Sequence, residues 1–490
     1  MPFSDCPITR PKWLLDTNFI LNIITQWSGI RIRIISVLSC ATAVVFMAVG
    51  TVAGMKVFHG VTGDITPIVI FGWVGVAFTA ASIAAYFIWI RNKSTSFVLQ
   101  SIFWPVTVYA ALFVSQMFFD DPVDVLELKI EAARQQGISF DDRSFSDEIN
   151  TRRANGEVVY RYVAPWNPVY GSARGPFTDS EIVQIGGISS VKTLMCNESG
   201  EFIYYNSDRN GLNNFDELWD HDGSVEFVFL GDSYTHGLCV NSEDNIVERF
   251  RTSYPDALNL GMSSTGPGRY SIIFRSLMRD VDVRKVFVLF YEGNDLQDLS
   301  YEVSDQKLRK YTTTPTIPEI DRARMDAGMI EFHEAELFAQ TTQEQKSSMP
   351  ILLKMILLQE VTDRLRTKAA RTFVKRSVPL PPFDHFERVF SDLRDVVSNQ
   401  GGELVFVYLP SHSGIKGVPG ACGSEAGCSR VKQEVLSIIS GLSINVVDID
   451  DVFRTYEDPL AFFPFRLFGH YTPEGYEVVA GEIVNYVANN

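Results

Sequence analysis

The chain carries two similar stretches, VEFVFLGDS at residues 225–233 and KVFVLFYEGND at residues 285–295. Each is an apolar run that ends in small polar residues. Three further apolar runs are separated from these two by helical segments, at residues 257–260, 403–409 and 444–449. Near-continuous apolar strands that alternate with helices are typical of a parallel sheet covered on both faces. The sequence therefore predicts an α/β domain with a parallel sheet over residues 224–490.

Polar or small residues follow three of the predicted strands. Ser233 comes directly after the first apolar run, Gly261 after the second along the chain and Asn294 after the third. In open parallel sheets a ligand binds beyond the carboxyl ends of the strands. A serine hydroxyl is a weak nucleophile and needs an adjacent base. We therefore expect a nucleophile and its partners at this edge of the sheet.

Together with GHYTPEGY at residues 469–476, these residues resemble the SGNH (GDSL-type) hydrolases, in which a serine, a glycine, an asparagine and a histidine occur in this order. The resemblance covers about residues 204–487 and implies a three-layer, doubly wound parallel sheet. It implies that Ser233 is the nucleophile of a serine ester hydrolase and that His470 is its base. It also implies an oxyanion hole made by the amides of Ser233 and Gly261 and the side chain of Asn294. No metal or organic cofactor is implied.

Other interpretations of these residues remain open. The general α/β-hydrolase motif is Gly-x-Ser-x-Gly, whereas Ser233 stands in Gly-Asp-Ser-Tyr-Thr. Gly261 is also compatible with a turn glycine, and Asn294 with a helix cap. His236, three residues after Ser233, and His412, after the fourth strand, are alternative bases.

The sequence departs from the family at the acid that orients the histidine. The family usually has an aspartate two or three residues before the histidine, but Leu467 and Phe468 occupy these positions. Loss of this acid can cost several orders of magnitude in rate. Either a Ser-His dyad operates, with a backbone carbonyl as its orienting group, or another acid approaches. The candidate acids are Asp448, Asp450, Asp451 and Asp458.

Three runs almost without charge precede this domain, at Ile34–Met55, Ile65–Ile90 and Phe97–Phe119. Each is long enough to cross a bilayer as a helix, which predicts three transmembrane helices within residues 34–119. Lys and Arg gather before the first run and between the second and third, which places residues 1–33 in the cytoplasm. This tail contains a stripe typical of an interfacial helix or of a helix packed on the spans. The chain is therefore predicted to be a multi-pass protein of the inner (plasma) membrane whose large domain is periplasmic or extracellular.

Two segments lie outside the predicted hydrolase core. Residues 120–223 contain short alternating runs and turn signals, which indicate a β-rich lead-in segment. A helical insertion at about residues 299–382, with helices at 331–339 and 351–371, is placed to shape or cover the site.

Four cysteines lie in the predicted extracytoplasmic part, and four cysteines allow three connectivities. Cys422 and Cys428 flank a short loop and are the first candidates for a disulfide; Cys196 and Cys239 are the other two. None of the spacings resembles a zinc site. The formal net charge of −16 argues against a nucleic-acid partner.

A membrane-anchored, outward-facing domain of this kind resembles the SGNH proteins that trim or transfer acyl groups on bacterial envelope glycans. The resemblance implies a membrane-anchored esterase that removes O-acyl groups, first of all O-acetyl groups, from an envelope or extracellular polysaccharide. The expected partners are an acylated glycan or another ester, membrane lipids, and other membrane proteins packed on small residues of the spans. An O-acyltransferase with the same Ser/His site, a lipid esterase, and a weakly active or inactive subunit of an envelope assembly are the alternatives.

Overall fold

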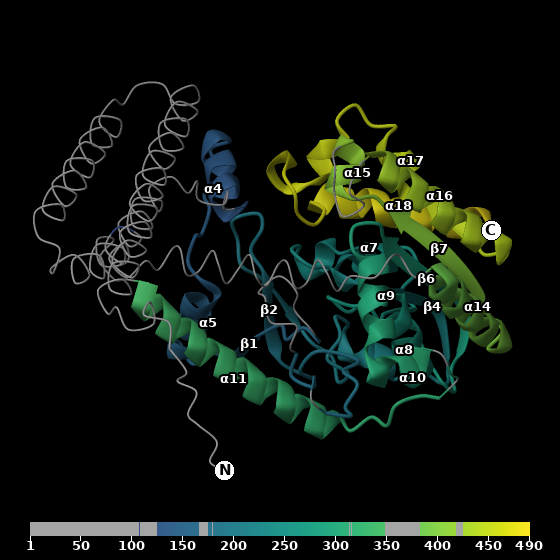
Figure 1. Ribbon diagram of the computed structural model, residues 1–490, viewed down its shortest axis with the longest axis horizontal. Helices are drawn as coiled ribbons and strands as arrows, with labels where there is room; N and C mark the ends of the chain where they lie inside the picture. Colours follow the sequence, from purple (N-terminus) through teal and green to yellow (C-terminus); the bar gives the residue numbers. More distant parts are fainter. Residues whose placement is uncertain are drawn as a thin grey trace, which may run out of the picture. The chain divides into compact units, whose positions relative to one another are not determined.

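The computed structural model describes residues 125–165, 175–178, 180–312, 314, 316–347, 383–417 and 425–490, together with Thr107 (Figure 1). All the elements below belong to one compact unit, Asp121–Asn490. Apart from Thr107, the predicted tail and membrane spans lie outside the described residues, as does the helix predicted at 351–371. Among the helices that are described, none is both long and apolar enough to cross a bilayer.

A five-stranded, wholly parallel sheet forms the centre of the unit (Figure 1). Its strand order is β5-β4-β6-β7-β8. The strands are β4 (Ser224–Gly231), β5 (Ala257–Asn259), β6 (Asp282–Tyr291), β7 (Glu403–Leu409) and β8 (Asn445–Asp448). Each coincides with one of the five predicted apolar runs to within a few residues. The predicted α/β class and parallel sheet are confirmed.

Alternate residues of the strands belong to two separate cores, one on each face of the sheet. In β4, Val228 and Leu230 pack into one core, whereas Phe227 and Phe229 pack into the other. This follows from the two-residue period of a strand. The first core is covered by α8 (Pro267–Leu277), α14 (Phe383–Asn399) and α16 (Glu425–Gly441). The second is covered by α7 (Ile246–Arg251), α17 (Ile449–Phe453) and α18 (Pro473–Asn489). The fold is therefore a three-layer α/β/α arrangement.

Helix α14 shows how the sequence fixes these layers. Its buried residues are Phe386, Val389, Phe390, Leu393 and Val397. They recur at intervals of three and four, so they form a single apolar stripe. Phe386 and Phe390 meet Phe406 of β7 with ring centroids 6.4 and 5.4 Å apart, respectively.

The lead-in contains helices as well as the predicted strands. Helices α4 (Val125–Gln135) and α5 (Phe145–Ala154) precede a small sheet of order β1-β2-β3. Its strands are β1 (Val159–Arg161), β2 (Lys192–Cys196) and β3 (Ile203–Asn206). Val163, Val183, Ile185 and Leu212 of the lead-in belong to the same core as α8 and β4. The lead-in is thus packed into the domain that it precedes.

The long helix α11 (Arg322–Ser347) and several shorter elements complete the unit. The shorter α-helices are α6 (Ser233–His236), α9 (Asp295–Ser304), α10 (Gln306–Thr312) and α15 (His412–Lys416). The 3-10 helices are η3 (Asp216–Trp219), η4 (Ser242–Asp244), η5 (Pro459–Phe462) and η6 (Pro464–Arg466). Helices α9 to α11 form the described part of the predicted insertion, and α11 contains the helix predicted at 331–339.

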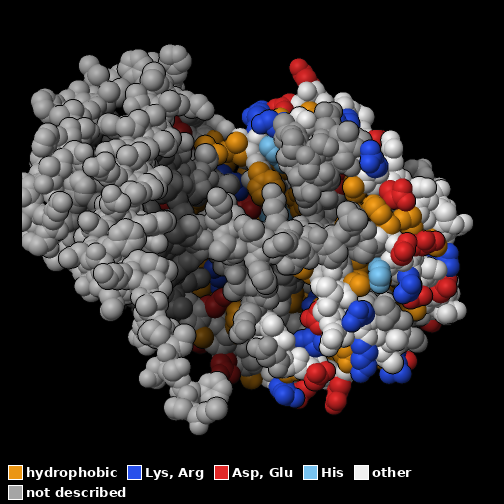
Figure 2. Space-filling view, viewed as in Figure 1, with side chains coloured by type: hydrophobic (Ala, Val, Ile, Leu, Met, Phe, Trp, Pro, Cys, Tyr) orange, Lys and Arg blue, Asp and Glu red, His pale blue; other side chains and the backbone are white. Residues whose placement is uncertain are grey.

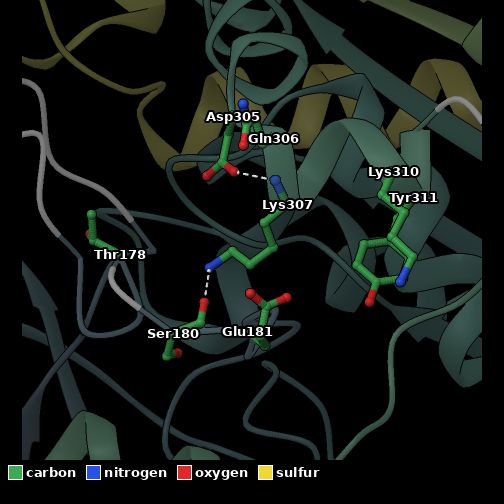
Figure 3. A pocket seen from close by; sticks show the side chains of 8 residues that line it. All are labelled: Thr178, Ser180, Glu181, Asp305, Gln306, Lys307, Lys310 and Tyr311. Carbon is green, nitrogen blue, oxygen red and sulfur yellow. Dashed lines mark hydrogen bonds between the residues drawn. The ribbon is translucent and has the colours of Figure 1, made fainter.

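A groove between α10 and the lead-in shows how these two parts are joined (Figure 3). The Lys307 ammonium donates hydrogen bonds to the carbonyl oxygens of Phe177, Ser180 and Ile182, at 2.8, 3.1 and 3.0 Å. An ammonium has three hydrogens, and all three are used here. Lys307 therefore fastens residues 177–182 to α10.

Charged side chains of both signs are mixed over the part of the described surface that Figure 2 shows. Many of them are paired. For example, Arg209 binds Asp216 and Asp220 at 2.7 and 2.8 Å. Exposed pairs of this kind are screened by solvent and contribute little to stability.

Candidate active site

Ser233 is the first residue of α6, directly after the turn that follows β4 at the carboxyl end of the sheet. Asp232 caps the helix because its Oδ1 accepts a hydrogen bond from the Tyr234 amide at 2.9 Å. The helix ends after one turn at Gly237, whose φ of 84° lies in the left-handed region that glycine adopts readily. This tight strand-turn-helix leaves the Ser233 side chain half-buried at the sheet edge.

The structure brings His470 to Ser233 although the two residues are far apart in sequence. The His470 Nε2 atom lies 2.9 Å from the Ser233 Oγ atom. The preceding residue is held by Tyr234, whose hydroxyl donates to the Gly469 carbonyl at 3.3 Å. The residue next to the serine thus positions the segment that carries the histidine. This is the geometry that a nucleophile and its general base require.

Glu198, in the turn between β2 and β3, orients His470. Its Oε1 lies 3.3 Å from His470 Nδ1, and its Oε2 accepts the His470 main-chain N–H at 2.8 Å. One carboxylate therefore contacts both the ring and the backbone of the histidine. Burial alone would raise the pKa of Glu198, but His470 and Lys129 outweigh it and lower the pKa to about 2. Glu198 is therefore ionised at neutral pH.

The four aspartates considered from the sequence have other partners, and the structure replaces them with Glu198. Asp448, Asp450 and Asp451 surround the Lys432 ammonium at 2.8, 2.8 and 3.5 Å. Asp458 pairs with Arg466 at 2.7 Å. The first three lie at the carboxyl end of β8, the edge strand that β6 and β7 separate from β4.

Sequence reasoning missed Glu198 because it is a glutamate that lies 272 residues before the histidine, in the lead-in. The motif Asn197-Glu198-Ser199 fits a glycosylation acceptor. In the structure the Asn197 side chain is used within the turn: it donates to the Asp141 carbonyl at 2.7 Å and accepts from the Gly200 amide at 3.0 Å. The available signal was the pair of cysteines, one shortly before Glu198 and one shortly after Ser233.

A disulfide between Cys196 and Cys239 links these two segments. Cys196 is the last residue of β2, two residues before Glu198, and Cys239 follows the short helix that begins at Ser233. The Cys239 Sγ atom lies 3.5 Å from His470 Nδ1. The predicted Cys422–Cys428 pair remains a prediction, because Cys422 lies outside the described residues.

Lys129 of α4 is a second lead-in residue at the site. It is 5% exposed, and its ammonium lies 3.5 Å from Glu198 Oε2. A Cβ atom added to Gly469 would come within 2.6 Å of the Glu198 carboxylate and 3.2 Å of the Lys129 ammonium. Glycine at position 469 therefore allows the backbone before the histidine to approach this ion pair closely.

Replacing Lys129 by methionine is expected to lower the unfolding free energy at pH 7 by about 3 kcal/mol, because the Glu198 carboxylate loses a buried partner. The pKa of Glu198 is lowered in the folded state, so its stabilising contribution is present above about pH 4.5 and is lost as the pH falls toward 2. The stability difference between the two chains should therefore shrink over this range. Urea denaturation at pH 7, 4.5 and 3 measures it. A difference that is the same at all three pH values would contradict the expectation.

The main-chain N–H of Gly261 does not point toward a position where it could bind an oxyanion in this structure. Its N–H donates to the Asn259 Oδ1 atom at 2.9 Å, and a main-chain amide has one hydrogen. A Cβ atom at this position would lie 2.4 Å from the His236 amide nitrogen. Gly261 is thus explained by close packing against α6, which corrects the oxyanion role expected from the resemblance.

Asn294 follows β6 and precedes α9, but its side chain does not cap that helix. Instead its Nδ2 donates to the Asp298 Oδ2 atom at 2.5 Å. An amide nitrogen has two hydrogens, so this contact leaves the second available to a substrate. Because β6 pairs directly with β4, with Leu289 opposite Gly231, Asn294 and Ser233 follow neighbouring strands at the same edge of the sheet.

The two alternative bases are engaged elsewhere. The His236 Nδ1 atom lies 2.9 Å from the Ser263 hydroxyl, and burial lowers the pKa of His236 to about 3. The His412 Nε2 atom lies 3.1 Å from the Arg466 carbonyl oxygen. His470 is therefore the histidine that the structure places on Ser233.

No family model and no curated protein matches the chain. Solved structures that resemble it include a lipase/acylhydrolase from Enterococcus faecalis (11% identity, 54% of this chain and 96% of that chain, TM-score 0.31). An acetyl xylan esterase, AlAXEase, has 10% identity over 54% of this chain and all of its own, with a TM-score of 0.30. An acetyl xylan esterase from Geobacillus stearothermophilus has 13% identity over 54% and 94%, with a TM-score of 0.29.

Proposed function

We propose that the chain is an SGNH-type serine ester hydrolase whose triad is Ser233, His470 and Glu198. The observation that carries this proposal is the continuous set of contacts from Ser233 Oγ to His470 Nε2 and from His470 Nδ1 to Glu198 Oε1, at 2.9 and 3.3 Å. A nucleophile in contact with a base, and a base held by an acid, is the arrangement that activates a serine.

In the first half of the reaction, Ser233 Oγ attacks the ester carbonyl carbon while His470 Nε2 takes the hydroxyl proton. The carboxylate of Glu198 stabilises the imidazolium that forms. The bond to the alcohol then breaks, and the alcohol oxygen receives the proton from His470. In the second half, His470 takes a proton from water while the water oxygen attacks the carbonyl carbon of the acyl-serine. The bond to Ser233 Oγ then breaks, His470 returns its proton to that oxygen, and the carboxylic acid leaves.

The negative oxygen of each tetrahedral intermediate needs hydrogen-bond donors. The second Nδ2 hydrogen of Asn294 and the main-chain N–H of Ser233 fill this role in the proposal. Gly261 is not included, because its amide is bonded to Asn259.

The substrate we propose is an O-acylated, first of all O-acetylated, polysaccharide outside the cytoplasm. The three apolar runs within residues 34–119 and the Lys and Arg pattern around them support membrane anchoring in this orientation. The Cys196–Cys239 disulfide supports an oxidising compartment. A non-catalytic subunit would not need an acid beside the histidine. The contact of Glu198 with His470 therefore favours the enzyme over that alternative.

The test is covalent labelling of the purified full chain with a fluorophosphonate probe. The activated Ser233 is expected to displace fluoride from phosphorus, and mass spectrometry should locate the adduct on the peptide that contains this residue. Ser233→Ala is the negative control for labelling. Hydrolysis of 4-nitrophenyl acetate and of acetylated xylan is then measured for both chains. A folded wild-type chain that neither reacts with the probe nor cleaves either ester would refute the proposal.

A further inference from the structure

The side chain of Asn294 has a fixed partner that the sequence did not indicate. Asn294 is the residue before α9, and Asp298 lies one turn into that helix. The contact between Asn294 Nδ2 and Asp298 Oδ2 is 2.5 Å long, shorter than is usual for an amide donor. Asp298 is 4% exposed, so the acceptor is shielded from water.

The surroundings of Asp298 hold it firmly. A Cβ atom added to Gly266 would lie 2.9 Å from the Asp298 Cβ atom, so the backbone before α8 packs directly on this side chain. One turn further along α9, Glu302 accepts the Gly266 and Arg269 amides at 2.8 and 3.2 Å. Helix α9 is therefore tied to the start of α8, and Asp298 lies between this attachment and Asn294.

We propose that Asp298 is a positioning residue for the oxyanion hole: it binds one Nδ2 hydrogen of Asn294 so that the other hydrogen faces the substrate oxygen. This inference rests on the proposed esterase function. The carboxamide of an asparagine can turn away from the site by rotation about its side-chain bonds. An error of 1 Å in the position of a catalytic group can cost about a hundredfold in rate. A buried acceptor on the same helix removes that freedom.

The acceptor must also be compatible with negative charge on the substrate. Burial, and then the carboxyls of Glu302 and Asp232, raise the pKa of Asp298 well above its usual range, while Asn294 and Arg269 oppose this in part. This shift favours the uncharged form of the Asp298 carboxyl. An uncharged carboxyl holds the amide without repelling the oxyanion, which a carboxylate at the same place would do.

The experiment compares kcat and KM for 4-nitrophenyl acetate in the full chain and its variants. Asp298→Ala is expected to lower kcat by about 10- to 100-fold with KM within twofold, because the lost orientation matters in the transition state. Asp298→Asn keeps an uncharged acceptor of the same shape and is expected to stay within about threefold of wild type. Asp305→Ala, at the end of the same helix, is the matched control and should leave kcat unchanged.

A double-mutant cycle separates positioning from general destabilisation. Asn294→Ala should lower kcat by about 100- to 1000-fold, and adding Asp298→Ala to it should lower kcat no further. The inference is overturned if Asp298→Ala matches wild type, if it costs the same factor in both backgrounds, or if Asp298→Asn is as slow as Asp298→Ala. A wild-type chain without esterase activity would overturn the proposed function and this inference together, whereas an active wild type with an unaffected Asp298→Ala would overturn this inference alone.

Discussion

Replacing Glu198 by glutamine is expected to lower kcat by roughly 10⁴-fold with a small change in KM, because an amide in place of the orienting carboxylate favours the wrong histidine tautomer. The Glu198 carboxylate accepts both from the His470 ring and from its main-chain N–H. A glutamine can keep the second contact, so the backbone should stay in place while the ring loses its anionic partner. Steady-state kinetics on 4-nitrophenyl acetate, with the rate of fluorophosphonate labelling as a second readout, measures the effect.

Asp451→Asn is the matched control. Asp451 was a candidate acid from the sequence, and its side chain is 79% exposed beside Lys432. Its replacement should leave kcat within twofold of wild type. Glu198→Asp keeps the charge but shortens the arm, and is expected to recover part of the rate. If Glu198→Gln kept full activity, the site would operate as a Ser-His dyad and Glu198 would have a structural role only.

Reduction of the Cys196–Cys239 disulfide is expected to weaken both activity and stability. The bond closes a loop with a sequence separation of 43 residues, and a cross-link of that length stabilises by roughly 4 kcal/mol in the chain-entropy model. It also joins the turn that carries Glu198 to the segment after Ser233. Without it the turn is expected to sample other positions, and kcat should fall by about 10- to 100-fold, as expected for a misplaced catalytic group.

Dithiothreitol titration, with thiols counted and kcat measured at each step, tests this expectation. Cys196→Ser/Cys239→Ser should start at the lower activity and should not respond to the reductant. Cys422→Ser/Cys428→Ser is the matched control, because it keeps the response of wild type if the relevant bond is Cys196–Cys239. Full activity in a chain shown to have free thiols at positions 196 and 239 would exclude a role for the disulfide in placing Glu198.

The sheet could be predicted because its strands are continuous apolar runs, for example residues 286–291, that are buried on both faces. The meeting of Ser233 with the C-terminal histidine could be predicted from the order of the motifs. The acid could not, because Glu198 reaches the site through the packing of a separate small sheet, and no local spacing records such packing. The Gly261 amide illustrates a second limit: motif order cannot say which way a single N–H points, and the Asn259 side chain decides it.

The position of Glu198 in the lead-in also bears on when this activity can arise. A ribosome releases the lead-in first, Ser233 later, and His470 a further 237 residues after the serine. No nascent chain that ends before His470 holds all three groups, and the segment that carries Glu198 must then pack against the segment that carries His470. Ester cleavage therefore requires that synthesis has passed His470, because a nascent chain that ends before this residue lacks the base that the proposed reaction needs.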